Sequence, residues 1–254
     1  MTSTKPYIEV SSLKKAFGDK IILNNFSVKI HQSESFVVIG GSGTGKSVFI
    51  KCIMGLLKPD SGKIILDGHD ITYLSPNDRQ KIARFGMLFQ GGALFDSLKI
   101  WENIAFGLTH GQNMHKEDAK KIALEKLDAV ELSSKVADLY PAELSGGMQK
   151  RVALARAIAI NPDIIFFDEP TTGLDPIVGG KINALISKCV KEVGATAITI
   201  THDIHSLRAI ADRVGLLFEG KLIWTGTVEE MDKTDDPYIQ QFINGNPEGP
   251  FTIE

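Results

Sequence analysis

The chain has 254 residues, of which 43% are hydrophobic and 23% are charged, and its formal net charge is −3. This composition is typical of a soluble globular protein, and it lacks the basic excess expected of a nucleic-acid binder. The first ten residues contain no signal-peptide core, and no apolar run approaches the ~20 residues that span a bilayer. We therefore expect no nucleic-acid partner, and any membrane association to come through a partner protein.

The first predicted elements are strands that lead into a glycine-rich loop. Residues 7–30 alternate between apolar and polar, which predicts two or three short antiparallel strands broken by a turn at Gly18 and Asp19. Phe17 precedes this turn, where its ring could stack on a purine; a place in the hydrophobic core is the alternative. A buried strand at residues 36–39 then runs into the motif G-x-x-x-x-G-K-S at residues 40–47.

This loop has the composition of a phosphate-binding site. Glycines allow backbone N–H groups to point at an anion, and a helix that begins near Gly45 adds the positive end of its dipole. Lys46 supplies a charge for the β- and γ-phosphates, and the hydroxyl of Ser47 is a suitable ligand for Mg²⁺. The residues expected to contact the nucleotide here are Gly40, Gly41, Ser42, Gly43, Thr44, Gly45, Lys46 and Ser47.

The middle of the chain is predicted to be helical. A strand at residues 63–66, a helix at 76–83 and a strand at 85–89 lead to Gln90 and two glycines, which indicate a flexible joint. Apolar residues then recur at helical spacing as far as residue 160. The predicted helices of this segment cover residues 100–108, 116–130 and 145–160.

The rest of the chain returns to buried strands. Because a helix separates two of them, a parallel sheet is expected. The predicted strands cover residues 164–167, 197–200, 213–218 and 221–225, and the helix covers residues 180–193. Residues 228–254 read as a polar extension with three isolated aromatic residues, Tyr238, Phe242 and Phe251. We expect this extension to have no core of its own and to anchor on a neighbouring subunit.

Two carboxylates follow the strand at residues 164–167 directly. The carboxyl ends of such strands are where open α/β sheets bind ligands. Asp168 is expected to hold Mg²⁺ through water, which completes the coordination begun by Ser47, and Glu169 is expected to act as general base or to orient a water molecule. Two solvated acids at a strand end are the alternative. The two cysteines, Cys52 and Cys189, lack metal-site spacing and fit a reducing compartment.

The sequence LSGGMQ at residues 144–149 resembles the signature of the ATP-binding subunits of ABC transporters, and the resemblance covers residues 7–227. It implies an α/β fold, the P-loop NTPase ABC cassette, with a mostly parallel core sheet, an N-terminal antiparallel β-subdomain and an all-α helical subdomain insert. The implied division is a core at residues 1–90 and 161–227, a helical insert at 91–160 and an extension at 228–254. It also implies an enzyme that hydrolyses ATP with Mg²⁺.

The same resemblance assigns roles to further residues. In the family, the signature residues Ser145, Gly146 and Gly147 reach the γ-phosphate bound by a second copy, so that ATP joins two subunits. Met148 stands where the family has Gln. Other matching residues are Gln90 as a ligand of Mg²⁺ or of the attacking water, Asp175 of the D-loop, His202 at the γ-phosphate and Phe17 against adenine. A purely structural role for His202 is the alternative.

Several longer segments resemble those of the ATPase of Mla-type phospholipid transport systems. They include FQGGALFDSLKIWENIAFGL, LDPIVGG and QQFINGNPEGPF. The implied partners are a membrane permease, an Mce-domain lipid-binding protein and a STAS-domain regulator, with the chain on the cytoplasmic face of a bacterial inner membrane. Leu94, Phe95, Leu98 and Trp101 are expected to receive the permease, or else to pack in the core. An ATPase for another solute and a soluble regulatory or repair ATPase are the alternative functions.

Overall fold

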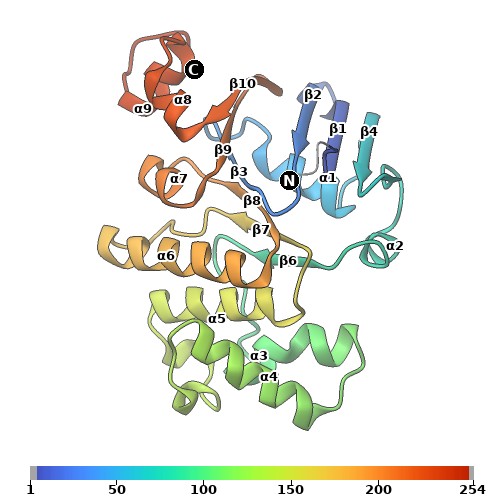
Figure 1. Cartoon of the computed structure of the whole chain (residues 1–254), viewed down its shortest axis with the longest axis vertical. Helices are drawn as coiled ribbons and strands as arrows, with labels where there is room; N and C mark the ends of the chain where they lie inside the picture. Colours follow the sequence, from blue (N-terminus) through green and yellow to red (C-terminus); the bar gives the residue numbers. More distant parts are fainter. Residues whose placement is uncertain (1–4, 252–254) are drawn as a thin grey trace. The chain divides into compact units, whose positions relative to one another are not determined.

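The computed structural model describes residues 5–251, which form two compact units. The first unit takes the described residues up to 82 and from 199 onward, and the second takes residues 83–198. Strands predominate in the first unit, whereas the second contains the long helices (Figure 1). The units are described separately below.

The first unit contains an antiparallel sheet with strand order β2-β1-β4-β5. Its strands are β1 (Ile8–Phe17), β2 (Lys20–Ile30), β4 (Ser61–Leu66) and β5 (His69–Asp70). β1 and β2 pair from Ile8 opposite Ile30 to Phe17 opposite Lys20, so the predicted turn at Gly18 and Asp19 is confirmed. The two strands are longer than the two or three short ones expected, because β-bulges let the pairing continue through irregular positions.

The same unit contains three strands in the order β10-β9-β3. They are β3 (Ser35–Ile39), β9 (Arg213–Phe218) and β10 (Lys221–Thr227). β3 runs parallel to β9, and β10 pairs with β9 in the antiparallel sense. The side chains at residues 36–39 of β3 are fully buried, as the apolar run predicts. Helix α1 (Lys46–Met54) follows the loop at the end of β3.

One buried cation fixes the far end of α1. Helix α2 (Pro76–Gln80) is shorter than the predicted helix at residues 76–83, and it carries Arg79, which is only 1% exposed. The guanidinium of Arg79 donates to the last carbonyls of α1 and to the loop before α2. Its acceptors are the carbonyls of Cys52, Ile53, Thr72 and Leu74. These bonds satisfy carbonyls at the C-terminus of α1 that have no partner within the helix.

The second unit combines parallel strands, in the order β8-β7-β6, with a group of helices. Its strands are β6 (Phe85–Leu88), β7 (Ile164–Asp168) and β8 (Thr196–Ile200), of which β8 reaches the sequence boundary of the unit. β6 and β7 pair in parallel. The main helices are α3 (Ile100–Phe106), α4 (Lys116–Ala129), α5 (Gly146–Ala159) and α6 (Pro176–Val193). A π-helix at Gly107–Gly111 follows α3, and short 3₁₀ turns lie at Ser134–Val136 and Pro141–Glu143.

Helices α3, α4 and α5 pack against one another, as Figure 1 shows. The three helices predicted at residues 100–108, 116–130 and 145–160 are confirmed to within two residues. Helix α6 begins four residues before the predicted start at 180, because Asp175 caps it and Pro176 occupies its first turn. Helix α7 (Ile204–Ile210) was not predicted; Asp203 caps this two-turn helix.

The C-terminal segment is folded, which corrects the expectation of an extension without a core. It forms α8 (Val228–Lys233) and α9 (Pro237–Asn244). The ring of Phe251 lies 4.8 Å from that of Phe218 at the end of β9 and 5.4 Å from that of Tyr238. The aromatic residues therefore pack on the chain's own strand, and their anchoring on a neighbouring subunit stays a prediction.

A buried amide fastens this segment. Gln241 on α9 is 6% exposed, and its side chain donates to the carbonyls of Asn246 and Phe251. Its Oε1 accepts from the backbone N–H of Phe251 at 2.7 Å. Because both ends of one amide are used, residues 246–251 are held against α9 without forming a helix themselves.

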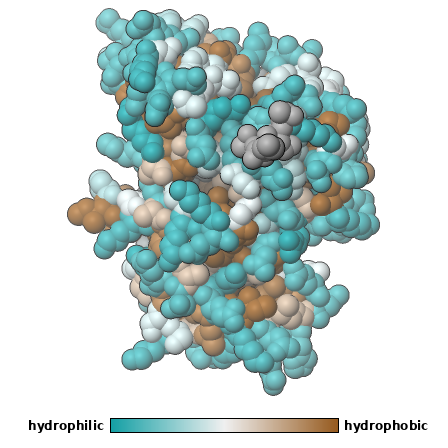
Figure 2. Space-filling model, in the orientation of Figure 1, coloured by the Kyte–Doolittle hydropathy of each residue, from teal (hydrophilic) through white to brown (hydrophobic). Residues whose placement is uncertain are grey.

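Among the described residues, no helix is both long and apolar enough to cross a membrane. The face shown in Figure 2 is mostly hydrophilic, with hydrophobic residues in separate patches. Cys52 and Cys189 are free and buried, and burial raises the pKa of each thiol to about 11. Both cysteines therefore pack as small apolar side chains.

We expect Arg79→Met to destabilise the chain by roughly 3–5 kcal/mol, because it removes four hydrogen bonds from one buried guanidinium to backbone carbonyls. Urea unfolding followed by circular dichroism measures this free energy. Lys81→Met is the matched control, since the Lys81 side chain is 76% exposed and its ion pair with Asp78 lies at the surface. Equal stability of the two variants would show that Arg79 does not hold α1 in place.

Candidate functional site

The loop at residues 40–47 is shaped as an anion cradle. Gly40, Gly43 and Gly45 have φ angles of 151°, 75° and 107°, in the range that favours glycine. The Lys46 side chain is buried, and its ammonium donates to the carbonyls of Gly40 and Gly41 at 2.8 Å. The Thr44 hydroxyl also donates to the Gly41 carbonyl, at 2.9 Å. The Gly40 and Gly41 carbonyls are thus used within the loop itself.

Close contacts with two strands fix this loop in place. A Cβ on Gly40 would lie 2.4 Å from the backbone oxygen of Leu217 in β9, and one on Gly45 would lie 2.9 Å from Ile22 in β2. No side chain could be accommodated at either position without moving the backbone. Ser47, which is expected to bind Mg²⁺, lies in the first turn of α1, and Ser42 is exposed on the loop.

The same unit brings His202 near the start of the loop. The backbone N–H of Thr201 donates to the Val38 carbonyl on β3 at 3.3 Å, two residues before Gly40. The Asp203 backbone N–H donates to the Thr201 hydroxyl at 3.0 Å, which shapes the turn that carries His202. The histidine is exposed in this unit and lies between β8 and α7. Such a position suits a group that contacts a ligand.

In the second unit, Asp168 ends β7 and Glu169 has a strained backbone. The φ angle of Glu169 is 49°, which non-glycine residues rarely adopt. Its carboxylate accepts a hydrogen bond from the Thr172 hydroxyl at 3.1 Å. Strain of this kind persists where the surroundings hold it, and it is common at functional sites. Thr172 therefore helps to hold the Glu169 carboxylate, a contact that the sequence did not predict.

The signature loop and the D-loop form one surface of this unit. Ser145 caps α5, accepting from the backbone N–H of Met148 at 3.4 Å. A Cβ on Gly147 would lie 2.9 Å from Val178 in the first turn of α6. Asp175 accepts from the backbone N–H groups of Ile177 and Val178 at 3.0 Å each. Asp175 thus caps helix α6, in addition to the role at the dimer interface that the resemblance implies.

Two cations of α5 hold the joint after β6. The Lys150 ammonium donates to the Gln90 carbonyl, and Arg156 donates to the carbonyls of Gly92 and Ala93 at 2.6 Å each. Burial lowers the pKa of Lys150, and the charges of Asp168 and Glu169 partly oppose this effect. The Gln90 side chain, predicted as a ligand, belongs to an exposed residue. No motif identified Lys150 or Arg156; the only signal was their position on the helix that begins at the signature.

A groove of about 400 Å³ lies beside this joint. Its apolar lining comes from β6, from the segment after β6, from the end of α3 and from the end of α5, and Arg156 contributes its cation. The aromatic lining residues are Phe85, Phe89, Phe95 and Phe106. Phe95 was predicted for such a surface and is 43% exposed, whereas Trp101 is only 9% exposed and does not line the groove. The core alternative therefore holds for Trp101, which packs under Lys116 and Lys120.

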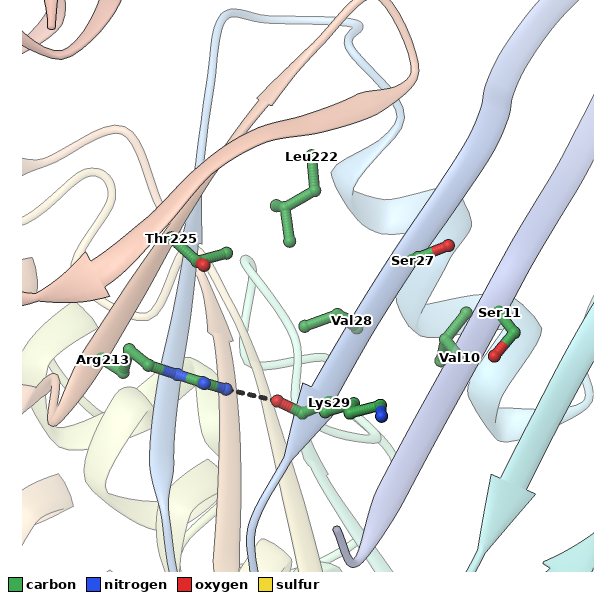
Figure 3. Close-up of a pocket in the computed structure, with 8 residues that line it drawn as sticks. All are labelled: Val10, Ser11, Ser27, Val28, Lys29, Arg213, Leu222 and Thr225. Carbon is green, nitrogen blue, oxygen red and sulfur yellow. Dashed lines mark hydrogen bonds between the residues drawn. The ribbon is translucent and has the colours of Figure 1, made fainter.

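A second cavity, of about 320 Å³, lies in the first unit between the β1–β2 and β9–β10 pairs (Figure 3). None of the predicted site residues lines it. Arg213 reaches across it and donates to the Lys29 carbonyl. Both cations already have carboxylate partners, Glu34 at 2.8 Å for Arg213 and Glu9 at 3.6 Å for Lys29. This cavity therefore lacks the unpaired positive charge of a phosphate site.

Comparisons with known proteins identify the class. Residues 23–172 match the family model described as ABC transporter. The chain is 35% identical to the dimeric ABC transporter cassette MJ0796, with a TM-score of 0.78 over 87% of this chain and 98% of that one. The chain therefore belongs to the ABC transporter family, and it is an ATPase with the predicted cassette fold.

Within this family the chain is MlaF-like. It is 40% identical to the intermembrane phospholipid transport system ATP-binding protein MlaF of Haemophilus influenzae, over 96% of this chain and 92% of the relative. It is 41% identical to the probable ribonucleotide transport ATP-binding protein mkl of Mycobacterium tuberculosis, over 96% of this chain and 68% of that one.

We expect Arg156→Met to release the joint after β6, because the Gly92 and Ala93 carbonyls lose charge-assisted hydrogen bonds. Hydrogen exchange of the Gly92 amide should accelerate about tenfold or more, since each such bond contributes ~1.5–3 kcal/mol. Arg151→Met is the control on the same helix, as Arg151 donates instead to the carbonyls of Val130 and Glu131. Equal exchange rates in the two variants would contradict this account.

Proposed function

We propose that this chain hydrolyses ATP to drive phospholipid transport between the inner and outer membranes of a bacterium. The identity of 40% to MlaF over nearly the full length of both proteins carries this proposal. The likeness to mkl, named for ribonucleotide transport, supports another solute as the second candidate. A soluble regulatory or repair ATPase is disfavoured, because a chain of net charge −3 lacks the basic surface that such work usually needs.

We assign separate steps of the work on ATP to the predicted site residues. We assign the loop at residues 40–47 to the phosphates, and we assign Glu169 to the attacking water as general base, with Thr172 aiming its carboxylate. His202 is assigned to the γ-phosphate. Phe17, whose side chain is half exposed on the β1–β2 hairpin, is assigned to the adenine.

Mg²⁺ fits the oxygen donors that this chain offers. The proposed ligands are the Ser47 hydroxyl, the Asp168 carboxylate through water and the Gln90 side chain. Among the described residues there is no cluster of three His, Cys, Asp or Glu side chains suited to a metal. This agrees with Mg²⁺, which is usually held by one or two protein oxygens together with phosphates and water. The ion would neutralise the charge that develops on the phosphates.

The first proposed partner is a second copy of this chain. The MJ0796 cassettes with the same fold were solved as dimers. Ser145, Gly146 and Gly147 lie at the N-terminus of α5, where backbone N–H groups favour an anion. We propose that this loop contacts the γ-phosphate bound by the other copy, and that Asp175 beside it serves the same interface.

The second proposed partner is a membrane permease, which would dock in the groove beside the joint. Its four aromatic residues offer a rigid apolar surface. The Phe95 backbone is fixed on both sides, because the buried Asn103 amide accepts from its N–H at 2.7 Å and donates to its carbonyl at 3.1 Å. An Mce-domain lipid-binding protein and a STAS-domain regulator would join the permease. The complex would place this chain on the cytoplasmic face of the inner membrane.

The test of this proposal is an affinity pull-down of the full chain from detergent-solubilised membranes, with proteins and bound lipids both identified by mass spectrometry. We expect a permease, an Mce-domain protein and phospholipid. Recovery of a different permease without phospholipid would contradict phospholipid as the substrate and favour another solute. The assignment as a transport ATPase would still stand.

Phe95→Asp should reduce recovery of the permease at least tenfold in the same pull-down, because it places a charge in an apolar contact. Tyr140→Asp is the matched control. Tyr140 is 42% exposed, close to the 43% of Phe95, and it does not line the groove. Thermal melting confirms that each variant is folded. Equal recovery with both variants would remove the groove as the docking site.

Glu169→Gln should keep ATP binding and slow hydrolysis by roughly 10²–10⁴, the contribution of a positioned base. Steady-state phosphate release measures the turnover, and size-exclusion chromatography with ATP shows whether a closed dimer accumulates. Thr172→Val should slow turnover less, since it removes only the hydroxyl that aims the carboxylate. Undiminished turnover of Glu169→Gln would refute the assigned role.

A further inference from the structure

The strand end that carries Phe17 is tied to Asp60, the residue before β4. One oxygen of Asp60 accepts from the Lys15 ammonium at 2.9 Å, and the other accepts from the Ala16 backbone N–H at 2.6 Å. The backbone N–H of Asp60 donates in turn to the Lys14 carbonyl at 2.9 Å. Three successive residues of β1 are therefore bound to one aspartate.

Lys15 also covers one face of the Phe17 ring. Its ammonium lies 5.4 Å from the ring centroid, within the ~6 Å of a cation–π contact. The Lys15 side chain is 15% exposed, whereas Phe17 is 50% exposed. The ammonium is thus held in place by Asp60 while much of the ring surface stays open to a ligand.

The β1–β2 hairpin joins this ring to the phosphate loop. Phe17 pairs with Lys20 and Ala16 pairs with Ile21. The next residue, Ile22, is the one that a Cβ on Gly45 would approach to 2.9 Å. A nucleotide with its phosphates in the loop therefore has the aromatic ring on the strand pair that borders the loop.

We propose that Lys15 and Asp60 are positioning residues for the base of the bound nucleotide. Lys15 fixes the Phe17 ring by covering one face and draws electron density toward its charge, so that the opposite face stacks better on an electron-rich purine. Asp60 keeps the Lys15 ammonium over the ring. This inference rests on the proposed role of Phe17 against adenine.

The charge state of Asp60 fits this role. The hydrogen bond from Lys15, together with that from the Ala16 backbone, lowers the pKa of the carboxyl below its ordinary value. The carboxylate therefore stays ionised at neutral pH and keeps its hold on the ammonium. Gly62 in β4 adds a second fixed point between the two strands, since a Cβ there would lie 2.6 Å from the Leu13 Cα in β1.

The test compares two ligands on the full chain by isothermal titration calorimetry in EDTA, which prevents hydrolysis. ATP reports on the base and the phosphates, and inorganic tripolyphosphate reports on the loop alone. Lys15→Met should weaken ATP binding about three- to tenfold, in line with the strength of a cation–π contact, and should change tripolyphosphate binding less than about twofold.

Three further variants serve as comparisons. Lys15→Arg should retain ATP affinity. Asp60→Asn should resemble Lys15→Met. Lys14→Met, on the exposed neighbouring lysine, removes the same charge and should change neither affinity.

Phe17→Ala separates the inference from the proposal beneath it. This variant should weaken ATP binding, and adding Lys15→Met to it should cost less than a further twofold, because the ring through which Lys15 acts is gone. Equal losses for ATP and tripolyphosphate, or an undiminished Lys15→Met loss in the Phe17→Ala background, would overturn the inference. An effect of Phe17→Ala without one of Lys15→Met would overturn the inference alone. Unchanged ATP affinity in Phe17→Ala would overturn both this inference and the proposed role of Phe17 against adenine.

Discussion

The phosphate loop lies where it does only because two of its glycines have no side chains. Gly40 meets the backbone of β9 and Gly45 meets β2 at distances that exclude a Cβ. The loop is thereby set against two separate strand pairs, and the buried Lys46 ammonium closes it from inside. The position of α1 follows from that of the loop, and the buried Arg79 then holds the other end of this helix.

Helix α5 has a comparable role in the second unit. It begins at the capping serine of the signature and, within its first three turns, presents Lys150 and Arg156 to the joint after β6. The signature loop and the joint are therefore attached to one rigid element. If the signature loop contacts a phosphate as proposed, helix α5 connects that contact to the joint that lines the aromatic groove.

The motifs predicted the strands and helices that they lie on, because loops of fixed length and composition leave few alternatives. Elements whose signals are short were not predicted. Helix α7 has only two turns, and its capping pair of Asp203 and Ser206 was overlooked. Helix α9 also has only short signals, namely a cap at Asp236, a proline after it and a glycine at its end. Contacts between distant residues, such as Lys15 with Asp60 or Arg156 with the joint, have no periodicity and could not be predicted from spacing.

The left-handed backbone at Glu169 sets activity against stability. A glycine or asparagine would adopt this conformation with less strain, so the carboxylate is kept at a cost of order 1–3 kcal/mol in folding free energy. If Glu169 has the catalytic role proposed for it, a population of variants selected only for heat resistance would drift toward glycine at this position and lose turnover as it gained stability.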